Sequence, residues 1–299
     1  MQIGLVGLGK MGFNLAVNIH RHQHEVIAFD IHEESLTSVK QKGVKAVSSL
    51  DELPKAFTEK RVIWLMIPAG DPVDHAISTL RKHLRRGDII IDGGNSFYKD
   101  SIRRANDLAA AGIDFLDCGT SGGTEGALHG VCAMIGGRKD AFDFCEPLFR
   151  DISVNDGYLY CGPPGSGHFV KMIHNGIEYG MMQSIAEGFE VMEKSEFNLD
   201  LTSVARVWNH GSVVRSWLME LTEKALSKDP KLQSIKGIMH SSGEGKWTLE
   251  TALEKQIATP VIALSLIMRY RSLQDDTFSG KIVAALRNEF GGHAVEKKK

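Results

Sequence analysis

Residues 2–12 read Gln2-Ile3-Gly4-Leu5-Val6-Gly7-Leu8-Gly9-Lys10-Met11-Gly12, and this stretch decides the fold of the first half of the chain. Its first five residues form a short apolar run typical of a buried strand, and an apolar-periodic helix follows Gly12. In that setting each glycine has a physical role: Gly7 makes the tight turn, Gly9 lets the backbone approach a pyrophosphate, and Gly12 lets helix and strand pack closely. We therefore expect residues 7–12 to bind a dinucleotide at the start of the helix, through the following set: Gly7, Leu8, Gly9, Lys10, Met11 and Gly12.

An acidic residue follows the second predicted strand. Residues 25–29 form this strand, and Asp30 lies 18 residues beyond Gly12. A carboxylate at this position accepts hydrogen bonds from the ribose hydroxyls of NAD and repels the 2′-phosphate of NADP. The next two residues, Ile31 and His32, provide no arginine for such a phosphate. We predict NAD as the cofactor, with a simple helix-capping role for Asp30 as the alternative.

Strand and helix patterns continue to alternate as far as residue 136. The predicted strands cover residues 61–67, 88–92, 113–117 and 130–136, and the predicted helices cover residues 73–83 and 99–111. This alternation is typical of an α/β fold, here a Rossmann-type doubly wound sheet whose ligands bind beyond the carboxyl ends of the strands. Two glycine-rich loops, residues 92–96 and 119–126, follow such strand ends. Their composition suits the binding of carboxylate or hydroxyl groups, although turns need no ligand to have it.

The second half of the chain is predicted to be helical. After Gly167 the strand patterns stop, and helical patterns cover approximately residues 168–194, 202–209, 213–226, 249–257, 261–272 and 279–290. We therefore predict an NAD-binding Rossmann domain over residues 1–164. An all-α domain for substrate binding and oligomerisation follows over residues 165–299.

A polar stripe runs along the first helix of this second half. Lys171, His174, Asn175 and Glu178 stand at positions i, i+3, i+4 and i+7, so they fall within an arc of about 100°. Most other positions of the helix are apolar. A partly solvated helix surface would show the same pattern. Because the helix directly follows a nucleotide-binding domain, we favour a catalytic face.

Composition argues against several classes of protein. The 299 residues are 42% hydrophobic and 24% charged with a net charge of −2, which gives no reason to expect nucleic acid binding. No apolar run approaches the roughly 18 residues of a membrane span. The four cysteines form no Cys-x-x-Cys pair and no His/Cys/Asp cluster has ligand spacing, so we expect no metal site. With no targeting segment recognised, we expect a cytoplasmic protein.

The whole chain resembles the decarboxylating 6-phosphogluconate dehydrogenases, in a short, NAD-preferring form, and more distantly the wider β-hydroxyacid dehydrogenases. The motifs that carry the resemblance are GLVGLGKMG (4–12), IDGGNS (91–96), SGG-x-E-G-A (121–127), GSGHFVKMIHNGIEYG (165–180), GEGKWT (243–248) and RNEFGGH (287–293). The resemblance implies oxidation of 6-phospho-D-gluconate by NAD with release of CO2 and D-ribulose 5-phosphate.

The resemblance also implies a role for individual residues. Lys171 corresponds to the general base and Glu178 to the general acid. The positions that correspond to contacts along the sugar acid are Asn95, Ser121, Gly122, Gly123, His174 and Asn175, and Asn95 is also expected to contact the cofactor. The groups that hold the substrate phosphate correspond to Tyr179, Arg269 and Arg287. His293 corresponds to a tail residue that reaches the site of a neighbouring subunit, so we expect a homo-oligomer.

Some questions stay open at this stage. A substrate-binding lysine of the family falls at Ser242, and Lys246 is a possible replacement. The longer family members carry a second helical segment that this chain lacks, which leaves dimer and tetramer as alternatives. A β-hydroxyacid dehydrogenase that acts on a small 3-hydroxy acid without decarboxylation is the second reading, but it would not explain Glu178. A NAD-binding regulator without turnover is the third.

Overall fold

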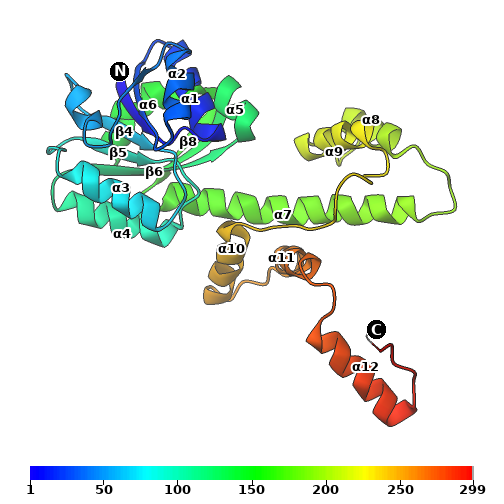
Figure 1. Cartoon of the computed structure of the whole chain (residues 1–299). Helices are drawn as coiled ribbons and strands as arrows, with labels where there is room; N and C mark the ends of the chain where they lie inside the picture. The colour runs from blue at the N-terminus through cyan, green and yellow to red at the C-terminus, as the bar shows by residue number, and fades with distance from the viewer. Residues whose placement is uncertain (298–299) are drawn as a thin grey trace. The chain divides into compact units, whose positions relative to one another are not determined.

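The computed structural model describes residues 1–297 of the chain. Two compact units are present, Met1–Asn175 and Gly176–Lys299. The long helix α7 (Ser166–Glu193) contains the division between them (Figure 1). None of the helices formed by the described residues is long and apolar enough to cross a membrane.

The first unit is built on one eight-stranded sheet with the order β3-β2-β1-β4-β5-β6-β7-β8. The strands are β1 (Gln2–Val6), β2 (Glu25–Phe29), β3 (Lys45–Ala46), β4 (Val62–Leu65), β5 (Ile89–Asp92), β6 (Asp114–Ser121), β7 (Val131–Gly137) and β8 (Ser153–Gly162). Neighbouring strands are parallel except β6 and β7. The strand order reverses between β1 and β4, the position at which sheets of this kind bind ligands.

Helices cover both faces of the sheet, since the strands are apolar on both sides. In β5, Ile89 and Ile91 belong to the core on one face and Ile90 to the core on the other. The first core includes residues of α1 (Lys10–Arg21), α2 (Glu33–Lys40) and α6 (Lys139–Ile152). The second includes residues of the 3-10 helix η1 (Leu53–Ala56), α3 (Asp71–Arg81) and α4 (Tyr98–Ala109). The predicted doubly wound α/β fold is confirmed.

The structure corrects the sequence prediction near residue 120. Residues 119–126 were expected to form a loop, which is wrong: residues 119–121 complete β6 and α5 (Gly123–His129) starts two residues later. The connection is short because Gly122 adopts a left-handed conformation with φ of +113°. Strand β8 was also not predicted. It lies at the edge of the sheet with polar residues on both sides, so it shows little hydrophobic pattern.

The second unit is helical over its described residues, as predicted. Besides the rest of α7 it contains α8 (Leu201–Gly211), α9 (Trp217–Lys228), α10 (Gly243–Glu254), α11 (Pro260–Ser272) and α12 (Phe278–Gly291). Two helix starts differ from the predicted patterns. Helix α9 starts at Trp217 because the Ser216 hydroxyl caps it, accepting the Met219 N–H at 3.1 Å. Helix α10 starts at Gly243, since the two glycines that suggested a break lie inside the helix.

Candidate functional site

The glycine loop between β1 and α1 has the geometry that its sequence predicts. Gly7 has a φ of +94°, and a Cβ there would lie 2.4 Å from the Met66 carbonyl oxygen. A Cβ at Gly12 would lie 2.0 Å from the Gly7 carbonyl oxygen, so helix and strand pack too closely for a side chain. A Cβ at Gly9 would meet nothing within 4 Å. Two glycines are therefore required by packing, and the third faces open space of the kind a pyrophosphate needs.

Asp30 is built into this loop. Its Oδ2 accepts the Leu8 N–H at 2.5 Å, and its Oδ1 accepts the His32 N–H at 2.8 Å and lies 2.9 Å from His32 Nδ1. Burial would raise the pKa of Asp30, but these hydrogen bonds outweigh it and hold the pKa below its ordinary value. Asp30 is not the cap of α2, whose N-cap is His32. The carboxylate therefore orders the glycine loop and stays ionised.

A cavity of about 560 Å³ adjoins the loop. Its walls include Gly7, Gly9, Asp30, His32 and His75. None of the residues that line it is an arginine or a lysine. The cavity therefore offers a carboxylate for ribose hydroxyls and no permanently charged cation for a 2′-phosphate.

The loop after β5 is folded around the fully buried carboxylate of Asp92. Its Oδ1 accepts the Gly94 N–H at 3.2 Å, and its Oδ2 accepts the Ser96 hydroxyl at 2.7 Å. A Cβ at Gly93 would lie 1.9 Å from the Trp64 indole nitrogen, so only glycine fits there. Asn95 is exposed between these anchored neighbours, at the carboxyl edge of the sheet. Its backbone is therefore fixed while its side chain reaches solvent.

The start of α7 is fixed to the sheet by Asp117, a residue that our sequence reasoning missed. The buried carboxylate of Asp117, on β6, accepts the Gly165 N–H at 2.7 Å and the His168 N–H at 2.8 Å. A Cβ at Gly167 would lie 2.4 Å from the Met134 carbonyl oxygen, so the helix lies directly on the strands. The signal was an aspartate near the carboxyl end of a predicted strand, which is where site residues gather.

Four of the predicted residues come together beside this contact. Lys171 is only 6% exposed, and its Nζ lies 3.5 Å from His174 Nδ1. The same Nδ1 lies 2.9 Å from Asn175 Oδ1, and His174 Nε2 lies 3.3 Å from the Ser121 hydroxyl. Gly122 and Gly123 follow Ser121 at the start of α5.

The contacts of His174 favour one protonation pattern. An amide oxygen only accepts hydrogen bonds, so the Asn175 contact places the hydrogen on Nδ1. Nε2 is then free to accept from the Ser121 hydroxyl. The Lys171 amine lies 3.5 Å from the same ring nitrogen, so the amine, the imidazole and the amide form one polar group.

Tyr179 and Arg269 come together within the second unit. The guanidinium carbon of Arg269 lies 3.5 Å from the centroid of the Tyr179 ring, and its Nη1 donates to the His240 carbonyl at 2.9 Å. A Cβ at Gly245 would lie 2.6 Å from Cε2 of the Tyr179 ring. Within residues 1–297 no carboxylate pairs with Arg269. The expected alternative, an internal ion pair, is therefore not found.

The other predicted residues are more dispersed. Glu178 is partly exposed on α7, two helical turns after Lys171. Arg287, on α12, and His293, just beyond it, are exposed. Ser242 precedes α10, and Lys246 points to Glu250, with 3.5 Å between its Nζ and the carboxylate. Over the described part of the chain, no group of three or more His, Cys, Asp or Glu side chains could hold a metal ion.

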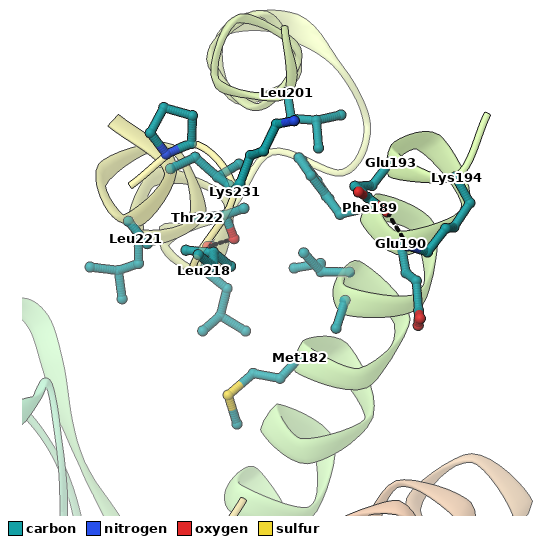
Figure 2. Close-up of a pocket in the computed structure, with 16 residues that line it drawn as sticks. Met182, Phe189, Glu190, Glu193, Lys194, Leu201, Leu218, Leu221, Thr222 and Lys231 are labelled. Carbon is teal, nitrogen blue, oxygen red and sulfur yellow. Dashed lines mark hydrogen bonds and ion pairs between the residues drawn. The ribbon is translucent and has the colours of Figure 1, made fainter. Parts of the chain in front are cut away.

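A second cavity, of about 570 Å³, contains none of the predicted site residues (Figure 2). It lies between α7, α8, α9 and the segment after α9, all in the second unit. Most of its walls are apolar, for example Met182, Phe189 and Leu218. Figure 2 shows charged side chains beside them, including the Glu193–Lys194 pair with 2.9 Å between carboxylate and ammonium.

Two family models match consecutive parts of the chain. The model of the NAD binding domain of 6-phosphogluconate dehydrogenase matches residues 2–162, and the model of the C-terminal domain of 6-phosphogluconate dehydrogenase matches residues 167–279. The chain belongs to the 6-phosphogluconate dehydrogenase family. The resemblance seen in the sequence motifs is thereby confirmed.

Individual 6-phosphogluconate dehydrogenases are similar over the full chain. A Bacillus subtilis protein, provisionally named a 6-phosphogluconate dehydrogenase, is 59% identical, with 100% of each chain covered. The NAD(+)-dependent, decarboxylating 6-phosphogluconate dehydrogenase of Haloferax volcanii is 41% identical over 100% of this chain and 99% of its own. The solved Plasmodium falciparum 6-phosphogluconate dehydrogenase, studied with NADP+ and with 6-phosphogluconate, has a TM-score of 0.85 at 33% identity, covering 100% of this chain and 67% of that one.

Proposed function

We propose that this protein oxidises and decarboxylates 6-phospho-D-gluconate to D-ribulose 5-phosphate and CO2, with reduction of NAD. The observation that carries the proposal is the buried Lys171 beside His174 and Asn175, in a chain that matches decarboxylating relatives over its full length. NAD accepts the hydride that leaves C3 of the substrate. The residues of the chain bind the sugar acid and move its protons.

Lys171 is the general base of the oxidation. As a neutral amine it takes the proton of the C3 hydroxyl while the hydride leaves the same carbon. His174, which contacts Asn175 and Ser121, lies beside this amine at 3.5 Å. A positioned base of this kind contributes about 10²–10⁴-fold to the rate.

The second step uses the proton that Lys171 has gained. The oxidised substrate is a β-keto acid, so the C1–C2 bond can break when the C3 ketone oxygen is hydrogen-bonded by the new ammonium. The bonding electrons move to that oxygen as CO2 leaves, which produces an enediol. Glu178 then donates a proton to the former C2 of the substrate, which becomes C1 of the ketose product.

The remaining predicted residues bind the substrate. Hydroxyl and carboxylate groups of the sugar acid are contacted by Asn95, Ser121, Gly122, Gly123, His174 and Asn175. Tyr179, Arg269 and Arg287 hold the phosphate. The position of Arg269 supports this role, because its guanidinium stacks on the Tyr179 ring and pairs with no carboxylate of the described chain. Ser242 stands where the family has a lysine, so this phosphate site carries one cation fewer.

NAD is the preferred cofactor in this proposal. The Asp30 carboxylate and the lack of arginine and lysine in the adjoining cavity both oppose a 2′-phosphate. The 41% identical Haloferax relative is named NAD(+)-dependent, whereas NADP+ is the cofactor of the Plasmodium enzyme. Asn95 also contacts the cofactor, from the loop after β5.

The active form is a homo-oligomer, either a dimer or a tetramer. Helix α12 buries none of its residues, and its apolar side chains Ile282, Leu286 and Phe290 are exposed. The tail with His293 reaches the site of a neighbouring subunit. We keep a cytoplasmic location and the domain limits 1–164 and 165–299 as predictions.

The test is product formation with 6-phospho-D-gluconate. We expect NADH to form and CO2 to be released in equal amounts, with NAD used better than NADP. NADH formation with a small 3-hydroxy acid but not with 6-phospho-D-gluconate would overturn the proposal in favour of a simple β-hydroxyacid dehydrogenase. No turnover across a panel of hydroxy acids would favour a NAD-binding regulator.

A further inference from the structure

A buried arginine lies at the centre of a polar network in the first unit. The side chain of Arg104, on α4, is only 1% exposed. Its Nε lies 2.8 Å from Asp74 Oδ1, and its Nη1 lies 3.3 Å from Asp92 Oδ2. Arg103 also contacts Asp74, at 3.0 Å, so two guanidinium groups face two carboxylates. The hydrogen bond from Arg104 is the largest of the effects that lower the pKa of Asp74.

The same guanidinium joins two loops at the carboxyl edge of the sheet. Its Nη2 donates to the Gly70 carbonyl at 3.0 Å, and its Nη1 donates to the Ser96 hydroxyl oxygen at 3.3 Å. Gly70 ends the loop after β4, and Ser96 lies in the loop after β5. These strands are parallel neighbours, so both loops lie at the edge where such sheets bind ligands. One side chain therefore fixes the separation of the two loops.

The network holds the chain on both sides of Asn95. Before it, the Gly94 N–H donates to Asp92 Oδ1. After it, the Ser96 hydroxyl donates to Asp92 Oδ2 and accepts from Arg104. Asn95 itself is exposed. The backbone position of Asn95 is consequently set by neighbours that Arg104 and Asp92 hold in place.

Such a network is expected to add little to the free energy of unfolding. Removing a guanidinium and a carboxylate from water offsets most of their attraction, and apolar residues of similar size often stabilise a core as well. The planar guanidinium group has donors in fixed directions, so it holds its hydrogen-bond partners in a defined arrangement. We propose that Arg104 is a positioning residue for the reaction: it holds residues 92–96 so that Asn95 contacts substrate and cofactor. This inference rests on the function proposed above.

The test compares Arg104→Lys with Arg103→Lys in the full-length enzyme. Lysine keeps the positive charge but lacks the planar set of donors of the guanidinium group. Arg103 is the matched control, because it is the next residue on α4 and also contacts Asp74 but reaches neither loop. For Arg104→Lys we expect kcat/KM for 6-phospho-D-gluconate to fall about 10- to 100-fold, as a displaced contact group would cause. NAD affinity should fall less than kcat/KM, because the glycine loop and Asp30, which supply the other cofactor contacts, are untouched.

A second readout does not depend on turnover. Amide hydrogen exchange of residues 93–97 should become faster in Arg104→Lys and stay unchanged in Arg103→Lys. Ser96→Ala removes only the hydroxyl that joins Arg104 to Asp92. This variant replaces Arg104→Lys in the test if Arg104→Lys does not fold. It should lower kcat/KM less than Arg104→Lys, and the double variant should lose little more than Arg104→Lys alone.

The inference is overturned if Arg104→Lys keeps wild-type kcat/KM and exchange, or if Arg103→Lys loses as much. A wild-type enzyme that does not turn over 6-phospho-D-gluconate would instead contradict the proposed function. In that case unchanged amide exchange in Arg104→Lys would show that Arg104 does not hold the loop either. Faster exchange of residues 93–97 would support the loop-holding role, although the substrate would be a different one.

Discussion

Gly119 and Lys171 lie so close together that a Cβ on Gly119 would be 2.3 Å from the Lys171 Cβ. Gly119 belongs to β6 and Lys171 to α7, and the Asp117 carboxylate fixes the same helix to the same strand two residues earlier. The proposed base is therefore held against the backbone of the sheet. The Lys171 Cβ, from which the flexible side chain extends, therefore has a fixed position.

We expect Gly119→Ala to damage catalysis more than folding. The added methyl group meets a rigid atom, so α7 must shift by a large part of an ångström, and a displacement of that size can lower kcat by about 10- to 100-fold. Overpacking should reduce the free energy of unfolding by about 1–3 kcal/mol. The control is Gly188→Ala, also on α7, where a Cβ meets nothing within 4 Å. Steady-state kinetics and thermal unfolding of both variants check the prediction, and equal kcat values would contradict it.

We expect Lys171→Met to lower kcat by at least about 10²-fold, because methionine keeps the length of the side chain but cannot take a proton. NAD should bind as it does to the wild type, since Lys171 is not among the residues that line the cavity beside the glycine loop. The measurements are the kcat for NADH formation and the Kd for NAD from a fluorescence titration. Near-normal turnover would remove Lys171 from the mechanism.

Glu178→Gln should slow the steps after hydride transfer. Glutamine keeps the shape of the side chain but cannot donate an acidic proton to the enediol, which should reduce the overall rate by about 10²-fold. Glu187→Gln is the matched control, since Glu187 is an exposed glutamate of the same helix. Rapid-mixing kinetics would show a first turnover of NADH that is less affected than the steady state. An overall rate equal to that of Glu187→Gln would argue against the acid role.

The sequence predicted the fold correctly, and it also predicted that several of the candidate residues lie close together. Gly12 packs against Gly7 within a short stretch of chain, and Lys171, His174 and Asn175 are brought together by helix periodicity alone. The contributions of Asp117 and Arg104 could not be predicted in the same way. Asp117 acts on residues 48 and 51 positions later, and the partners of Arg104 lie 8 to 34 positions away. Such contacts depend on the order of strands in the sheet, which no short pattern contains.

Asp30→Asn should weaken the preference for NAD over NADP. The amide removes the charge that repels a 2′-phosphate, and it also accepts the Leu8 N–H less strongly, so kcat/KM for NAD should fall by about tenfold. The ratio of kcat/KM values for the two cofactors measures the preference. An unchanged ratio would show that Asp30 does not set it.

The Asp30 carboxylate should not change its charge within the neutral pH range in the wild-type enzyme. Because the pKa of Asp30 in the folded protein lies below its ordinary value, the group is ionised throughout the neutral range. Its contribution to stability is present above the unfolded pKa of about 3.9 and is lost only as the pH falls through the lower folded value. Titration of Asp30 should therefore add no pH dependence to the NAD preference between about pH 5.5 and 8. The same pH series with Asp30→Asn is the control, and a part of the pH dependence that Asp30→Asn abolishes would contradict the prediction.

Leu286→Glu should lower both the oligomeric state and the activity. Leu286 is 57% exposed on α12, a helix that buries none of its residues in a single chain. If this face packs against a second subunit, a buried charge there would be strongly unfavourable. Light scattering should then show a smaller molar mass than for the wild type, and kcat/KM should fall by at least about tenfold because the tail with His293 leaves its site. The control is Lys281→Gln on the same exposed helix but outside the segment 287–293, which should change neither quantity. A wild-type protein that is fully active as a monomer would contradict this prediction, and His293 would then have no role in the site of a neighbouring subunit.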